Sequence, residues 1–261
     1  MKATDLLVGI TILLFVLSCS RNKLEPKGFV VSQPEQNEND VQIDGIASDT
    51  MGFRTRPGDV ILTGFNRYRL TTIYKININK RTNSTFIGSN DYYSNYSEFQ
   101  DNYGNHWHYH YMPGIEAVYG YNMVNISVYD LVLRQQKEFF EKPVLIKTLY
   151  YPSFLQDTLN YKPVLRNYYM VSVYDEDSNK DGFINENDLR HFYYFDMEAS
   201  SKTSLIPKEY SVVSSDYDPG NDIMLINAKH DDNQNGKAEN NEEMHIFWID
   251  LKNPLNNGMM Y

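Results

Sequence analysis

Residues 177–188, D-S-N-K-D-G-F-I-N-E-N-D, place oxygen-bearing side chains at the spacing that a calcium loop requires. Gly182 stands at position six, where the backbone must turn sharply, and Ile184 at position eight is apolar. Ca²⁺ is a hard cation that takes about six to eight oxygens, so the sequence predicts one calcium site here, with a plain polar turn as the alternative. The expected ligands, including the carbonyl of Phe183, are Asp177, Asn179, Asp181, Phe183, Asn185 and Asp188.

A second stretch with the same spacing begins 54 residues later, at Asp231. It has Gly236 at position six, but Ala238 at position eight offers a smaller apolar anchor. Glu242 at position twelve is long enough to bind an ion through both carboxylate oxygens. The expected ligands of this second calcium site, with Lys237 acting through its carbonyl, are Asp231, Asn233, Asn235, Lys237, Glu239 and Glu242.

Both stretches resemble the calcium loops of EF-hand proteins and dockerins, in which a helix follows the loop. Here the flanking residues 168–174 and 191–195 are aromatic and β-branched, which is typical of strands. We therefore expect each loop at the tip of a β-hairpin, as an insertion between two neighbouring strands.

The strand that follows each loop belongs to a longer repeat of about 54 residues. Short strands ending in Asn or Asp recur at Asn77, Asp130, Asp196 and Asp250. Prolines recur at a similar interval, at Pro57, Pro113, Pro163 and Pro219, and three of them precede glycine, which predicts a turn before the next strand. Such units suit propeller blades of antiparallel strands.

The repeat resembles the TolB-like propeller repeat through S-S-D-Y-D-P-G-N-D-I-M-L-I, from residue 214, and I-F-W-I-D-L, residues 246–251. The resemblance implies an all-β fold, a small β-propeller of about four blades with the calcium loops at hairpin tips. The expected repeats are residues 50–105, 106–160, 161–210 and 211–261, together a domain of residues 50–261.

The first residues predict a leader rather than part of the fold. Lys2 precedes an apolar run at residues 6–17, which is short for a membrane span. The sequence V-L-S-C at residues 16–19 resembles the lipobox of bacterial lipoproteins, and Cys19 is the only cysteine in the chain. The resemblance implies a signal peptide over residues 1–18, a lipid on Cys19 that binds the membrane, and an envelope location that favours the outer over the inner membrane. An ordinary secretory leader is the alternative.

Residues 19–49 are mostly polar and predict a tether between the lipidated cysteine and the folded domain. The whole chain carries 24 Lys and Arg against 34 Asp and Glu, a formal net charge of −10. A protein that binds phosphates needs clustered cations, so the charge argues against nucleic acid as a partner.

Three histidines alternate in H-W-H-Y-H, where His106, His108 and His110 would project to one side of a strand. The stretch precedes Pro113, so we expect it to be an inner strand facing a propeller channel. Zinc ligation, contact with a ligand in the channel, and ordinary packing all remain open.

Catalysis has little support in the sequence. None of the common nucleophile, metalloprotease or nucleotide motifs occurs, and only Glu116 and Asp216 lie near strands where a propeller glycosidase would place paired carboxylates. We expect a calcium-binding envelope lipoprotein that binds a protein or a glycan. The alternatives are a glycan-active hydrolase or lyase and a purely structural envelope component.

Overall fold

The computed structural model describes residues 24–31, 53–92, 99–100, 106–107 and 112–261. They form two compact units, a small one of residues 24–26 and 77–86 and a larger one that takes the other described residues. In the small unit, Leu24 pairs with Asn79 at the end of β3 (Tyr68–Asn79), and β4 (Ser84–Ile87) pairs with β3. The Asn79 side chain accepts hydrogen bonds from the amides of Arg81 and Thr82 and so closes the turn between the two strands.

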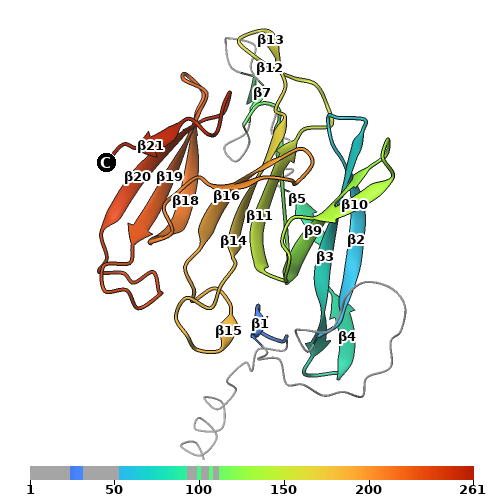
Figure 1. Ribbon diagram of the computed structural model, residues 1–261, viewed down its shortest axis with the longest axis vertical. Helices are drawn as coiled ribbons and strands as arrows, with labels where there is room; N and C mark the ends of the chain where they lie inside the picture. The colour runs from blue at the N-terminus through green and yellow to red at the C-terminus, as the bar shows by residue number, and fades with distance from the viewer. Residues whose placement is uncertain (1–23, 32–52, 93–98, 101–105, 108–111) are drawn as a thin grey trace, which may run out of the picture. The chain divides into compact units, whose positions relative to one another are not determined.

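The larger unit contains three multi-stranded antiparallel sheets (Figure 1). The first has the order β10-β9-β3-β2, with β2 at Thr55–Leu62, β9 at Met123–Asp130 and β10 at Gln135–Glu138. The second has the order β17-β16-β14-β11-β8-β5, with bounds β5 Asn90–Tyr92, β8 Ile115–Gly120, β11 Leu145–Pro152, β14 Tyr168–Tyr174, β16 His191–Asp196 and β17 Lys202–Ser204. The third has the order β18-β19-β20-β21, with bounds β18 Tyr210–Asp218, β19 Ile223–His230, β20 Met244–Asp250 and β21 Asn257–Met259.

The larger unit also contains three two-stranded ladders. These are β1 (Phe29–Val30) with β15 (Phe183–Ile184), β6 (Phe99–Gln100) with β7 (His106–Trp107), and β12 (Asp157–Leu159) with β13 (Lys162–Val164). No helix occurs among the described residues, so the prediction of an all-β fold is confirmed.

The middle sheet is buried on both faces, and β14 shows why. All seven residues of β14 are buried. Side chains alternate along a strand, so Tyr169, Val171 and Val173 join one apolar core, shared with β3, β9 and β11. Tyr168 and Met170 point the other way, into a second core shared with β18, β19 and β20. The chain therefore stacks its third sheet against the middle one, and this arrangement positions the candidate site.

The four-bladed propeller is not confirmed, because the sheets do not follow the predicted repeats. β3 pairs with β9, so strands from the first two predicted repeats share one sheet. β8 and β9 are separated by two residues in sequence, yet they belong to different sheets. Only the fourth predicted repeat, residues 211–261, coincides with a sheet of four strands. Turn signals mark hairpins, but they carry no information about which sheet a strand joins.

Two smaller expectations were wrong. Pro57 and Gly58 lie inside β2 at a bulge rather than in a turn, and β2 is an edge strand, where a missing amide hydrogen is tolerated. Within the predicted tether, residues 29–30 form β1. Phe29 is the reason, because its ring is buried and lies 4.9 Å from the ring of Phe53.

Candidate functional site

Both predicted calcium loops lie where the sequence placed them, at hairpin tips. The first connects β14 to β16 and the second connects β19 to β20, and each pair of strands is hydrogen-bonded in antiparallel register. Extended aromatic and β-branched runs on either side account for the hairpins, since such residues favour strands over helices.

In the first loop, the side chains at positions one, three and five fold the backbone around themselves. Asp177 accepts hydrogen bonds from the amides of Asp181 (3.0 Å) and Gly182 (2.9 Å). Asn179 also accepts from the Asp181 amide, at 2.9 Å, and Asp181 accepts from the Phe183 amide, at 3.0 Å. Lys180 and Gly182 have positive φ angles of 59° and 84°, which turn the chain inward.

The second loop repeats this pattern position by position. Asp231 accepts from the amides of Asn235 (3.0 Å) and Gly236 (2.9 Å), and Asn233 accepts from the Asn235 amide at 2.9 Å. Asn235 accepts from the Lys237 amide at 2.9 Å. Gln234 and Gly236 have φ angles of 57° and 74°. Two segments 54 residues apart therefore adopt one local structure, and their side-chain oxygens accept backbone amides in the same order.

The carboxylates at position twelve are buried in both loops. Asp188 is 1% exposed and accepts from the amides of Asn185 (2.8 Å) and Asn179 (3.3 Å). Glu242 is 8% exposed and accepts from the Glu239 amide through one oxygen, at 2.6 Å, while its buried Oε1 has no hydrogen-bond partner among the described residues.

Burial raises the pKa of both carboxyl groups at position twelve. For Asp188, the acidic neighbours Asp177 and Asp181 raise the pKa further, although hydrogen bonds from backbone amides oppose the shift. For Glu242, Asp231 and Glu239 act in the same way, against one opposing amide. A bound cation would offset the charge that these acids bring together, so the donor set fits a hard cation.

The two loops contact each other, which the sequence did not predict. Ser178, at position two of the first loop, donates from its hydroxyl to the carbonyl of Gly236 (2.7 Å), at position six of the second. The same hydroxyl accepts from the Leu189 amide (2.8 Å) and lies 3.4 Å from the carboxylate of Asp188. One serine thus links the second loop to the end of the first.

The first loop also binds the segment that contains β1. β15 lies inside this loop, and Phe29 pairs with Ile184 while Val30 pairs with Phe183. The Val31 amide donates to the carbonyl of Gly182 at 2.9 Å. Ile184, the apolar residue at position eight, is 2% exposed and packs in a small core with Phe29. In the second loop the equivalent Ala238 is exposed.

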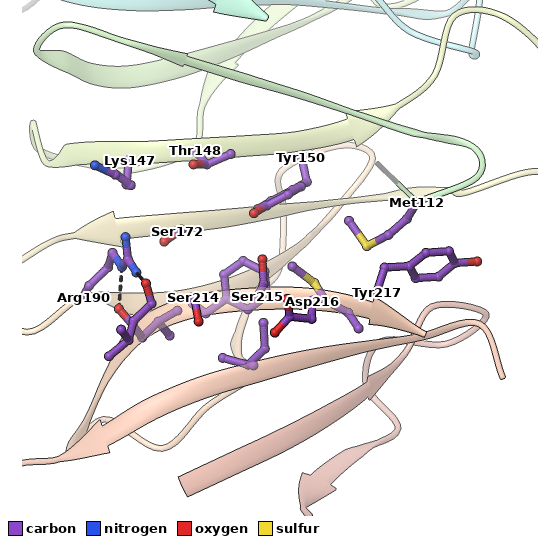
Figure 2. Close-up of a pocket in the computed structure, with 15 residues that line it drawn as sticks. Met112, Lys147, Thr148, Tyr150, Ser172, Arg190, Ser214, Ser215, Asp216 and Tyr217 are labelled. Carbon is purple, nitrogen blue, oxygen red and sulfur yellow. Dashed lines mark hydrogen bonds between the residues drawn. The ribbon is translucent and has the colours of Figure 1, made fainter. Parts of the chain in front are cut away.

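Next to the first loop, a cleft of about 330 Å³ lies between the middle sheet and the third sheet (Figure 2). Arg190 follows the loop and closes one part of the cleft, because its guanidinium donates to the carbonyls of Val212 (2.6 Å) and Val213. The cleft is lined by Met112, Lys147, Thr148, Tyr150, Ser172, Arg190, Phe192, Val212, Val213, Ser214, Ser215, Asp216, Tyr217, Met224 and Ile226.

The other predicted residues do not gather into one site. Cys19, His108 and His110 lie outside the described residues, and His106 is described only as part of β7, paired with β6. Glu116 accepts hydrogen bonds from the hydroxyls of Tyr151 (2.7 Å) and Ser153 (2.9 Å) and does not line the cleft that contains Asp216. The paired-carboxylate arrangement of a glycosidase is therefore not seen in this cleft.

Within the described ranges, no three His, Cys, Asp or Glu side chains form a compact metal-binding group. The ligand sets expected for the loops also use carboxamides and backbone carbonyls, so calcium binding stays a prediction. The described residues contain no helix long and apolar enough to cross a membrane. No protein-family model and no curated protein matches the chain.

Proposed function

We propose that this protein binds two calcium ions through the loops at residues 177–188 and 231–242, and that the ions stabilise a binding module. The observation that carries the proposal is the repeated loop structure. Two loops share the same hydrogen-bond pattern, the same positive φ angles and a buried carboxylate at position twelve.

The unpartnered Oε1 of Glu242 supports the proposal independently. A buried carboxylate oxygen without a donor loses its hydration and gains nothing in return, which costs about 1–3 kcal/mol or more for a charged group. Ca²⁺ bound through both oxygens of Glu242 would satisfy this atom and offset the charges of Asp231 and Glu239.

The position of the loops indicates what the ions would do. Each loop joins the ends of two paired strands, and Ser178 joins one loop to the other. Bound ions would therefore fix the middle and third sheets at the end of the cleft where Arg190 lies. We further propose, from Cys19 and the leader, that a lipid holds the module at the bacterial cell envelope, where a protein or a glycan is its partner. We also keep the proposal that the repeats are related to those of a β-propeller.

Calorimetric titration of residues 24–261 with Ca²⁺ tests the proposal. We expect heat for about two ions, and saturation at 100 times Kd stabilises the fold by about 2.7 kcal/mol per site. Asp177→Asn with Asp181→Asn should abolish one site, and Asp231→Asn with Glu242→Gln the other. As a matched control, Asp218→Asn alters an exposed turn outside both loops and should leave the heats unchanged. Absence of heat and identical melting curves with Ca²⁺ and with chelator would show that the loops are polar turns.

A further inference from the structure

One strand contributes an unbroken run of residues to the cleft. β18 lines it with Val212, Val213, Ser214, Ser215, Asp216 and Tyr217. Side chains alternate between the two faces of a sheet, so a strand that lines a cavity with its face contributes every second residue. β19 does so, with Met224 and Ile226. The run in β18 shows that this strand presents its backbone edge to the cleft.

β18 is an edge strand of the third sheet, because β19 is its only partner there. At its beginning, the Val212 amide donates to the carbonyl of Arg190, and the Arg190 side chain returns two hydrogen bonds to β18. Beyond that point, Val213, Ser214, Ser215 and Asp216 are exposed. Within the described part of the chain, the outward backbone groups of Ser214–Asp216 have no other strand beside them, and such an edge is a template for a further strand.

The surface opposite this edge is equipped to receive side chains. Thr148 and Ser172, from the middle sheet, are buried hydroxyl residues that line the cleft, and the buried side chains of Phe192, Met224 and Ile226 lie at its apolar base. Figure 2 shows Lys147 and Arg190 at one end of the cleft and Asp216 farther along β18. The cleft therefore has cationic side chains at one end, where Lys147 also lies 3.3 Å from the carboxylate of Glu186, and apolar and hydroxyl side chains between. Toward the other end lies the carboxylate of Asp216, which accepts a hydrogen bond from Asn227 at 3.2 Å.

We propose that the cleft binds an extended peptide segment of a partner protein, which adds to β18 as a further strand. The peptide would carry an acidic residue toward Lys147 and Arg190, a basic residue toward Asp216, and apolar or small residues between them. The regular donors and acceptors of a strand edge match those of another extended chain, which favours a peptide over a saccharide. This inference rests on the proposed role as a binding module and names its partner class, but it does not require that the loops bind calcium.

The probe is an array of synthetic hexapeptides with Glu first, Lys last and four varied apolar or hydroxyl positions, applied to the folded protein. We expect the tightest peptides to shift and protect the backbone amides of Ser214–Asp216 in NMR spectra. Two further sets of the peptide carry N-methyl groups on alternate amides, one on the odd and one on the even positions. Only one of these sets of amides faces β18, so its methylation should weaken binding about tenfold or more and methylation of the other set should have little effect.

Two matched proline variants test the edge itself. Successive amides of a strand point to opposite sides, so of Ser214→Pro and Ser215→Pro one removes a hydrogen bond to β19 and the other removes a donor to the cleft. We expect one variant to melt at a lower temperature, and the other to keep its melting temperature and lose peptide binding about tenfold.

Each result separates this inference from the proposed calcium function, because Ca²⁺ titration is run on the same samples. Calcium heat with no hexapeptide bound overturns strand addition alone, whereas hexapeptide binding without calcium heat overturns the calcium function alone. Equal binding by the two sets of N-methylated peptides also overturns the proposal. So do amide shifts in Ser214–Asp216 that appear with an N-acetylglucosamine trisaccharide but with none of the hexapeptides.

Discussion

Alanine at the two loop glycines should have unequal effects, because only one of them lies against the other loop. Gly182 and Gly236 occupy position six and share a positive φ angle, 84° and 74°. A Cβ added to Gly182 meets no atom within 4 Å. A Cβ added to Gly236 would lie 2.0 Å from the carbonyl oxygen of Ser178 and 2.6 Å from the amide nitrogen of Asn179. The pair therefore separates backbone strain from loop-to-loop packing.

The expected losses follow from these contacts. Left-handed backbone costs an alanine about 1–2 kcal/mol, and Gly182→Ala should show this alone. In Gly236→Ala the neighbour is backbone and cannot rotate away, so overpacking adds about 1–3 kcal/mol. Displacement of the loop also breaks the hydrogen bond from Ser178, worth about 1 kcal/mol. We expect Gly236→Ala to lower the free energy of unfolding by about 3–6 kcal/mol in total.

Urea unfolding of both variants beside the wild type, in chelator, measures the two losses without any contribution from calcium. Ser178→Ala serves as a further control, because it removes the hydrogen bonds to Gly236 and from the Leu189 amide without adding volume, and it should cost about 2 kcal/mol. Equal losses for the two glycine variants, or a larger loss for Gly182→Ala, would show that the two loops do not pack together as described.

Three further predictions follow from other parts of the chain. Cys19→Ser should leave an unprocessed precursor, and unchanged membrane fractionation and mobility would refute lipidation. Arg166→Met should cost about 3–5 kcal/mol in urea unfolding, because it leaves Asp222 buried without the partner it holds at 2.7 Å, whereas Lys147→Met at an exposed ion pair should cost under about 1 kcal/mol. The hydrogen bond from Arg67 lowers the pKa of Asp130 from 3.8 to about 2. The stabilisation from this carboxylate is therefore present above pH 3.8 and is lost as the pH falls toward 2. The difference in urea midpoint between wild type and Asp130→Asn should shrink over that interval, and a constant difference would contradict this expectation.

The sequence predicted the local structure well wherever the signal was local. Loop spacing, glycines and flanking aromatic strands lie within about twenty residues, and they correctly placed both loops on hairpins. The strand-ending acids also behave as local signals, since Asp130, Asp196 and Asp250 each accept backbone amides in the following turn. In the first repeat Asn79 rather than Asn77 has this role. These interactions depend on neighbours in the sequence and so leave a pattern.

Long-range pairing left no comparable pattern. Nothing in β3 indicates that β9 lies on its other side from β2, because the alternation of apolar and polar residues shows which face is buried but not which strand is the neighbour. Ser178 and Arg190 looked like ordinary polar residues, yet they join the loops and one end of the cleft. Their roles depend on partners 58 and 22 residues away, so only the folded arrangement reveals them.

The short ladder between β1 and β15 determines how mechanical tension along the chain would reach the first loop. A pull on the residues that precede Gly28 acts first on the hydrogen bonds that Gly28 makes with Asn122 and Lys75. Beyond them it acts on two paired residues, the Val31 hydrogen bond and the buried ring of Phe29. These contacts hold the backbone of Gly182 and Phe183, whose carbonyl is an expected calcium ligand. Each backbone hydrogen bond contributes about 1 kcal/mol and the phenyl ring about 1.5–3 kcal/mol, so this segment can peel away while the three sheets remain intact. Tension therefore reaches the first loop through this ladder. A force too weak to unfold the three sheets would still alter the loop that the ladder restrains.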